Sequence, residues 1–346
     1  MNLEQLSHMT DHEWDNLIAP WQGCMIYHHS AWLRFIADST PGLRLIRFRV
    51  VENNVTAGYF AGFIAQKGPF LVLGSPLYGW NTDFMGPISD EQLDLPKFLH
   101  TMESWCRRNH IHFLQMGHPA LPEEAMRQAG YLVNRMSHYQ IPLSTSEERM
   151  WQQLRGKCRN RIRKGIANGL SVEKCDDSSI VQEFYAQHTD VFARQALAPN
   201  YPLSTVHSLV RNLLEAEGLL ALRIRSNGET IATGLFPHDN SHLHSFGIAS
   251  WGKERAACPN ELLYWSAMQW GGRHGLQSFT IGGQYRQSPS GGVFKQKFNG
   301  ELVPFLRYAK ALSPPLNVAY RAYGMWRDFR SRHRAPWDGK IREKEA

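Results

Sequence analysis

The chain has 346 residues, which is the length of two domains of ordinary size and excludes a single small module. Hydrophobic residues make up 42% and charged residues 20%, a composition typical of a folded protein and not of a disordered or fibrous one. The formal net charge of +7 favours partners that carry phosphate: nucleic acid, nucleotide-linked sugars, coenzyme A or an anionic membrane face.

The first thirty residues do not resemble a signal peptide, because they lack its basic start and apolar middle and contain Glu4, Asp11, Glu13 and Asp15. No stretch approaches the roughly 20 apolar residues of a membrane helix. We therefore expect a cytoplasmic protein. The five cysteines form no Cys-x-x-Cys pair, which argues against a disulfide framework and a zinc knuckle; they are at positions 24, 106, 158, 175 and 258.

Two parts of the sequence repeat each other. Segment 47–60 shares an Arg-x-Arg start and a Gly-x-Phe end with segment 223–236, and each has a turn pair between apolar runs. Both segments are therefore expected to be β-hairpins. A Trp, an Arg and a Gly recur further on with the same spacing, at 105, 108 and 117 and at 270, 273 and 282. Each copy predicts a hairpin, a connecting segment, a helix and a strand, and one copy contains an insertion.

The predicted helices span about 95–109 and 260–274, and the strands that follow span 111–116 and 276–281. In the first copy a long loop, 74–87, precedes the helix and contains three aromatic residues. Tyr78 and Trp80 would suit stacking on a sugar or a uridine of an acceptor, and Asp83 would bind its hydroxyl or amine. The alternative is an ordered Ω-loop that packs on its own side chains.

Between the two copies the sequence predicts one helix over about 146–168, with overlapping capping boxes at Ser144 and Thr145 and a terminating Gly169. Its apolar stripe is Trp151, Leu154, Cys158, Ile162 and Ile166. Six basic residues lie within ten positions on the other faces, with no acidic residue among them: Arg155, Lys157, Arg159, Arg161, Arg163 and Lys164. A solvated face is one interpretation. Because like charges repel along a helix, the cluster favours a ligand that carries phosphate.

The basic helix and a second motif resemble a known superfamily. The run 151–172 contains Lys157-Cys158-Arg159, Ile162-Arg163-Lys164 and Gly169-Leu170, and Gly291-Gly292-Val293-Phe294-Lys295 follows near the end. Together they resemble the Fem-type peptidyltransferases and their GNAT-fold acetyltransferase relatives, over about residues 27–312. The resemblance implies an α/β (α+β) fold with two tandem GNAT-like domains, each a mixed central sheet flanked by helices. We expect an acceptor-side domain at 1–145, a donor-side domain with the catalytic loop at 146–315, and a basic aromatic tail at 316–346.

The implied activity is acyl transfer to an amine. In the polysaccharide-associated branch the donor would be acetyl-CoA or another acyl-CoA, with no tightly bound cofactor, and the acceptor an amine of a cell-envelope saccharide or its precursor. In the peptidoglycan branch the donor would be aminoacyl-tRNA and the acceptor a peptidoglycan precursor. The chain lacks the Gln/Arg-x-x-Gly-x-Gly/Ala phosphate loop of ordinary GNAT enzymes near Asn260, the inserted coiled coil of some Fem enzymes, and an Asp before Gly282-Gly283. A non-catalytic transferase fold that binds anionic ligands stays an alternative.

The glycine-rich loop 282–292 and its flank supply the catalytic candidates. Lys295, aligned by resemblance with the family's Phe-Lys motif, would stabilise an oxyanion or donor phosphates. Lys297 shares its face if this segment is a strand and could exchange roles with it. Tyr285 could donate a proton, and Arg286 could hold a phosphate or carboxylate. Arg159, Arg163 and Lys164 of the basic helix are the further candidates for phosphate binding. A mobile surface loop is the alternative interpretation of 282–292.

Three histidines, His238, His242 and His244, match no strong zinc spacing, so we expect no metal and a hairpin with polar strand residues. His244 is a candidate general base. The tail 316–346 places apolar and aromatic residues at helical spacing among arginines. This pattern predicts either an interfacial helix at the inner face of an anionic membrane or a helix packed on the second domain.

Overall fold

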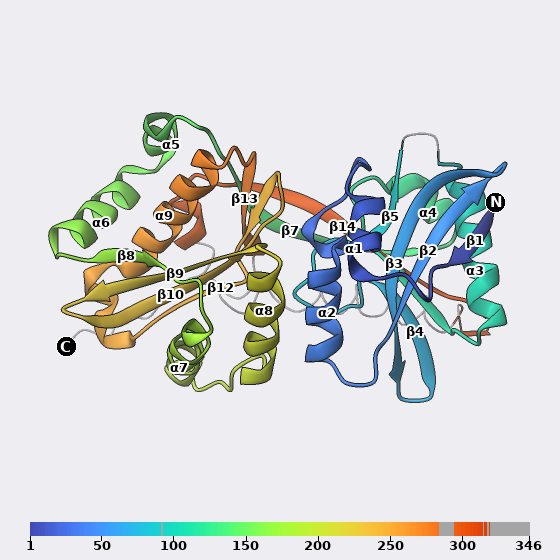
Figure 1. Ribbon diagram of the computed structural model, residues 1–346, viewed down its shortest axis with the longest axis horizontal. Coiled ribbons are helices and arrows are strands. Elements are labelled where there is room, and N and C mark those ends of the chain that lie inside the picture. The colour runs from blue at the N-terminus through green and yellow to red at the C-terminus, as the bar shows by residue number, and fades with distance from the viewer. Residues whose placement is uncertain (91–92, 284–293, 314, 317, 319–346) are drawn as a thin grey trace.

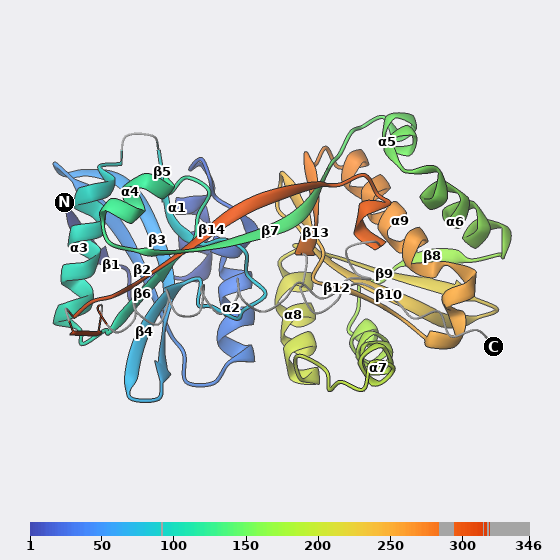
Figure 2. The ribbon, with the colours of Figure 1, turned by 180° about the vertical axis from the view of Figure 1, so that it is seen from behind.

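The computed structural model describes residues 1–90, 93–283, 294–313, 315, 316 and 318. Two lobes lie side by side and are joined by two long strands, β7 (Leu132–Pro142) and β14 (Glu301–Ala311), which run from one lobe into the other (Figures 1 and 2). Within these ranges, no helix has the length and apolarity that crossing a bilayer requires.

The N lobe consists of the residues before β7, and its sheet is covered by helices on both faces. The apolar side chains of β3 alternate between a core beneath α3 and a second core beneath α1 and α2. The elements of the N lobe are β1 (Asn2–Gln5), α1 (Asp11–Ile18), η1 (Ile26–His28), α2 (Ser30–Ser39), β2 (Arg44–Glu52), β3 (Val55–Lys67), β4 (Phe70–Ser75), β5 (Gly86–Ser89), α3 (Leu95–Arg108), β6 (Phe113–Met116) and α4 (Glu123–Gln128).

The C lobe consists of the described residues between β7 and β14. The helices α6 and α9 lie on one side of its four-stranded sheet, and α7 and α8 lie on the other (Figure 1). Its elements are α5 (Glu147–Gln153), α6 (Gly156–Ala167), β8 (Ser171–Lys174), α7 (Ser179–Ala193), α8 (Leu203–Glu215), β9 (Leu219–Ser226), β10 (Glu229–Pro237), β11 (His242–His244), β12 (Gly247–Ser250), η2 (Gly252–Ala257), α9 (Pro259–Arg273) and β13 (Ser278–Gly283).

The larger sheet is mixed, as predicted, whereas the described pairs of the smaller sheet are all antiparallel. The larger has the order β1-β2-β3-β4-β6-β14-β7-β13-β11, with β5 paired to β3, and the smaller has the order β12-β10-β9-β8. The pairs β4–β6 and β11–β13 are parallel, whereas the other pairs are antiparallel. Because β7 pairs with β14 over nine residues along one edge and with β13 along the other edge, it carries one sheet across both lobes.

The repeated element order predicted from the sequence is confirmed. The hairpins β2–β3 and β9–β10 turn at Asn53-Asn54 and Asn227-Gly228, and all four residues have positive φ, which favours Asn and Gly. The helices α3 and α9 follow, and then the strands β6 and β13.

Each lobe opens its sheet at the same place. In the N lobe, β4 pairs with β6, but after loop 76–85 the chain returns as β5 and pairs with β3. In the C lobe, β11 pairs with β13, but two residues later β12 pairs with β10. Among the described residues, β5 does not pair with β6, and β12 does not pair with β13. We call the openings the N-lobe split, between β5 and residues 117–122, and the C-lobe split, between β12 and β13.

The single helix predicted over 146–168 is wrong, because the chain forms α5 and α6 with a break at Leu154-Arg155. Both residues have extended backbone angles, and the Arg155 N–H donates to the carbonyl of Lys297 at 3.1 Å. The N-cap of α5 is Ser146, whose hydroxyl accepts from the Arg149 N–H, and not the predicted Ser144 or Thr145. Most of the apolar stripe is nevertheless buried, whereas Ile166 is 58% exposed.

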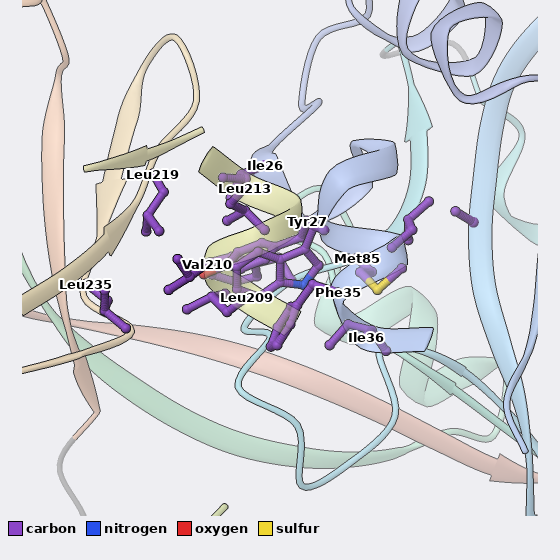
Figure 3. Close-up of a cluster of buried hydrophobic side chains, with 14 of the residues drawn as sticks. Ile26, Tyr27, Phe35, Ile36, Met85, Leu209, Val210, Leu213, Leu219 and Leu235 are labelled. Atoms are coloured by element: carbon purple, nitrogen blue, oxygen red, sulfur yellow. The ribbon is translucent and has the colours of Figure 1, made fainter. Parts of the chain in front are cut away.

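The two lobes share one apolar core. Helix α2 of the N lobe packs against α8 of the C lobe, with Phe35 and Ile36 beside Leu209 and Leu213 (Figure 3). The hydroxyl of Ser208 on α8 donates to the carbonyl of Phe35, and Asp38 forms an ion pair with Arg211. Burial of this much apolar surface fixes the position of one lobe against the other.

The predicted division of the chain at 145 and 315 stays a prediction. The last strand within 146–315, β14, lies between β6 and β7 and extends the sheet of the N lobe. The predicted tail 316–346 lies outside the described residues, apart from residues 316 and 318.

Candidate active site

Five side chains from both lobes gather where the lobes meet. They are Tyr27 of η1, Asp83 of loop 76–85, His138 of β7, His244 of β11 and Lys295 of the helical turn 294–296. The same region holds two cavities, and His244 and Thr280 line both of them. The site therefore combines residues that are up to 268 positions apart in the sequence (27 to 295).

His244 is the buried centre of this site, with 8% of its surface exposed. Its Nδ1 lies 3.2 Å from the Tyr27 hydroxyl, and its Nε2 is buried and has no hydrogen-bond partner in the described part of the chain. Burial lowers the pKa of His244 to about 4, although the nearby Asp239 and Asp83 carboxylates oppose the shift. At neutral pH the imidazole is uncharged and has a single N–H. When Nδ1 carries this hydrogen and donates it to the Tyr27 hydroxyl, Nε2 is free to accept a proton.

Asp83 faces the same centre and lines one cavity with His244, while its acceptor-binding role stays a prediction. Its Oδ2 lies 3.3 Å from His138 Nδ1. Burial would raise the pKa of Asp83, but the hydrogen bond to His138 and the charges around it outweigh burial and lower the pKa. The neighbouring Thr82 is held by Trp32 Nε1, which donates to its hydroxyl at 3.1 Å, and by Arg307, which donates to its carbonyl. The carboxylate is thus ionised and fixed in position.

Tyr78 and Trp80, the other predicted acceptor-binding residues, are positioned differently. The Tyr78 N–H donates to Gln115, and the Trp80 ring packs edge-on against Phe63 at 5.3 Å. Neither residue is among those that line the described cavities of the site. Their stacking on an acceptor stays a prediction.

Lys295 lies on a helical turn, 294–296, and not on the strand that the sequence alternation suggested. Its ammonium donates to the carbonyl of Gly283 at 2.7 Å. Burial lowers the pKa of Lys295 to about 8, against the opposing effect of the Asp83 carboxylate. Lys297 points elsewhere: its ammonium lies 2.5 Å from the buried carboxylate of Glu261. Of the two lysines, Lys295 is therefore the one beside the site.

Asp239, which the sequence analysis did not select, ties the lobes together next to the site. Its carboxylate accepts hydrogen bonds from the N–H groups of Ile26, Ser241 and His242 at 3.0, 2.8 and 2.7 Å. Burial raises its pKa, but hydrogen bonds and the adjacent histidines lower it far below the ordinary value. Asp239 thereby sets η1, with Tyr27, against β11, with His244.

The predicted phosphate-binding residues lie on α6, outside this centre. Arg159 donates to the carbonyls of Trp151 and Gln152, and the Arg163 guanidinium lies over the Trp151 ring at 5.3 Å. Lys164 is exposed. Tyr285 and Arg286 lie outside the described residues. These roles stay predictions.

The sequence also left Tyr27 and His138 unselected. The run Tyr27-His28-His29 was the available signal, whereas His138 sits in a plain strand pattern. Within the described ranges, no group of three His, Cys, Asp or Glu side chains could hold a metal ion. His238, one of the three histidines considered for a metal, packs against the Trp270 ring.

Comparison with known proteins agrees with this fold. Residues 152–291 match the family described as acetyltransferase (GNAT) domain. FemX superposes with a TM-score of 0.72 at 11% identity, covering 88% of this chain and 96% of that one. None of the curated proteins matches the sequence.

Two further structures share the fold. The C-terminal domain of a putative lysylphosphatidylglycerol synthetase from Agrobacterium fabrum has a TM-score of 0.55 at 15% identity, with coverages of 87% and 92%. A tandem GNAT protein from the clavulanic acid biosynthesis pathway has a TM-score of 0.52 at 10% identity, with coverages of 90% and 99%. Residues 152–291 therefore resemble a GNAT-type acetyltransferase domain, and the tandem GNAT-like fold expected from the sequence is confirmed.

Proposed function

We propose that the protein is an N-acyltransferase that moves an acyl group from acyl-CoA to an amine of a cell-envelope saccharide or its precursor. The observation that carries the proposal is His244, a buried and uncharged imidazole with an unpartnered Nε2 at the junction of two cavities. Such a group can take a proton from an attacking amine at neutral pH. The saccharide acceptor rests on the sequence resemblance, and it would place the protein in the cytoplasm at the inner face of the membrane.

The C-lobe split is the proposed entrance of the donor. Within the described residues, β12 pairs with β10 alone, so one edge of its backbone can hydrogen-bond an extended chain with amide groups. The pantetheine arm of CoA is such a chain. A polar cavity of about 80 Å³ lies at the inner end of the split, lined in part by Asp83, His244 and Ser245. The reacting thioester would sit there, beside Lys295.

The donor phosphates would lie at the outer end of α9. Gly165 of α6 packs against the carbonyls of Ala257 and Cys258 just before α9 begins, so the neighbouring Lys164 is close to the N-terminus of that helix. Helix N-termini attract anions, and basic side chains add to the attraction. This placement supports the phosphate-binding role proposed for α6.

The reaction needs no covalent enzyme intermediate. The amine nitrogen attacks the thioester carbonyl, a C–N bond forms, and the C–S bond then breaks to release CoA. His244 Nε2 takes the proton that the amine loses, while the Asp83 carboxylate orients the amine. The Lys295 ammonium stabilises the oxyanion and the departing thiolate, and Tyr285 is the proposed proton donor to the sulfur.

The first test is calorimetric titration of the purified chain with acetyl-CoA, followed by acetyl transfer to glucosamine. We expect saturable binding of acetyl-CoA and transfer that Lys295→Ala slows about 10²- to 10³-fold, whereas Lys67→Ala at an exposed strand end has no effect. Absence of acetyl-CoA binding would overturn the proposal.

Aminoacyl-tRNA is the second candidate donor, favoured by the exposed basic side chains of α6. A parallel titration with bulk aminoacyl-tRNA distinguishes the two donors, and activity that ribonuclease removes would assign the chain to the tRNA-dependent branch. Binding of neither donor would favour the non-catalytic alternative.

A further inference from the structure

Two adjoining cavities lead from His244 into the N lobe. The first, of about 380 Å³, has His244 and Thr280 at its inner end. The second, of about 530 Å³, lies in the N-lobe split beside Pro87 of β5. Because the two cavities share four lining residues, we treat them as one space and call it the apolar corridor; the shared residues are Met25, His118, Pro119 and Leu121.

One wall of the apolar corridor is aliphatic and aromatic. Phe84 and Phe305 pack edge to face at 5.2 Å, and Val303 and Leu306 of β14 continue the wall. In the described ranges, the residues lining the first cavity include no Lys, Arg, Asp or Glu, and those lining the second include one, Asp90. A ligand gains free energy here by burying apolar surface, whereas a charged or strongly hydrated group loses its solvation.

The inner end of the corridor is polar. His244 Nε2 is buried without a described partner, and His138 connects this end to the Asp83 carboxylate. The polar donor cavity lies on the other side of His244 and Thr280. An amine that enters through the corridor would therefore reach the thioester carbonyl from one side of His244, while the rest of the donor lies on the other side. Direct transfer between two bound substrates requires such an arrangement.

We propose that the apolar corridor holds the body of the acceptor, and that the acceptor is a primary amine on an uncharged body with an apolar face or chain. The placement of the amine at His244 rests on the proposed function. The inference narrows the acceptor from any amine of an envelope saccharide to one whose phosphates, if present, stay outside the corridor.

The test is calorimetric binding of butylamine, hexylamine and octylamine, with putrescine as the counterpart of butylamine that carries a second ammonium. Burial of each added CH₂ should tighten binding about threefold to fourfold until the corridor is filled. Putrescine should bind more weakly than butylamine, because its second ammonium would be desolvated.

Leu121→Trp fills the middle of the corridor and should remove the dependence on chain length. Val303→Trp, at a half-buried position that pairs with His138 in the sheet, tests the same point if the first variant does not fold. Val55→Trp is the matched control, because Val55 is 66% exposed at the start of β3.

Affinity that does not change with chain length, or that survives both corridor variants, would overturn the inference. Acetyl transfer to glucosamine that is equal in wild type and Val303→Trp would overturn it too and leave the proposed function standing. Chain-length-dependent amine binding by a protein that neither binds acetyl-CoA nor transfers acetyl would support the corridor and overturn the proposed function.

Discussion

The two lobes open their sheets at the same place and fill the openings differently. In the C lobe two residues, Ser245 and Phe246, separate β11 from β12, whereas in the N lobe the ten residues of loop 76–85 separate β4 from β5. The N-lobe split holds a cavity of about 530 Å³, and the C-lobe split leads to a polar one of about 80 Å³. The longer loop also carries Asp83 to the centre. Two lobes with similar topology can therefore bind different substrates when one loop differs in length.

The largest expected effect is at Lys295, the basic residue that the C-lobe side brings to the centre. Removing one group that stabilises an oxyanion typically costs about 10²- to 10³-fold in turnover, so Lys295→Ala should lower kcat by that factor. Thermal unfolding should stay unchanged, and Lys295→Arg should recover part of the activity. Equal turnover by Lys295→Ala would mean that the C lobe binds the donor without stabilising the transition state.

The pH dependence of kcat/KM should have two limbs, one from His244 and one from Lys295, which the C lobe brings to the centre. With a pKa of about 4, His244 is uncharged above that pH, so activity rises through pH 4–5. With a pKa of about 8, Lys295 loses its charge above that pH, so activity falls about tenfold per unit. Lys295→Arg should remove the alkaline fall, because Arg stays charged. An alkaline limb that is identical in Lys295→Arg would assign it to another group.

The free energy of unfolding should fall in acid. The pKa of His244 is about 4 in the folded chain and about 6.5 when unfolded, so the unfolded state binds a proton that the folded state refuses between these values. Stability present above pH 6.5 is therefore lost as the pH falls to 4, by about 3 kcal/mol from this group. Urea unfolding of wild type and His244→Gln at pH 7 and 4.5 measures it. An equal loss in the variant would assign the effect to other histidines.

Filling each split separately tests the assignment of donor and acceptor. Ser245→Trp overfills the polar cavity and should raise the KM for acetyl-CoA about tenfold or more, with little change in the acceptor KM. Leu121→Trp should raise the acceptor KM and leave the donor KM unchanged. Steady-state kinetics with each substrate varied in turn provides both values. If both variants raise the same KM, the two splits do not serve separate substrates.

The order of hairpins, helices and strands in the two lobes was predictable from the sequence because it depends on local patterns. The turn pairs at Asn53 and Asn227 and the spacing of Trp105 and Trp270 report hairpins and helices directly. The site was predictable only in part. Asp83, His244 and Lys295 were selected from the sequence, by a loop, a strand pattern and a resemblance respectively, and their roles stay predictions. Tyr27 and His138 become neighbours of the site only through the packing of η1 and β7 between the lobes.

The break in the predicted helix shows the same limit. The capping pattern at Ser144 and Thr145 is local and favours one long helix, but the Arg155 N–H finds its partner at Lys297, more than a hundred residues away. Local propensity is outweighed here by a tertiary hydrogen bond and by burial of Leu154. No pattern within the helix itself reports such a contact.

The smallest expected effect is at Lys164, which would give the C-lobe split its attraction for phosphate. Lys164→Ala should weaken acetyl-CoA binding about threefold at low salt, because one exposed charge near a helix N-terminus contributes less than 1 kcal/mol. The difference should vanish near 1 M salt, where charges are screened within about 3 Å. Lys67→Ala in the N lobe should change nothing. If Lys164→Ala instead weakens only aminoacyl-tRNA binding, α6 binds nucleic acid. The proposal that the CoA phosphates lie at the C-lobe split would then be wrong, although the tandem fold would be unaffected.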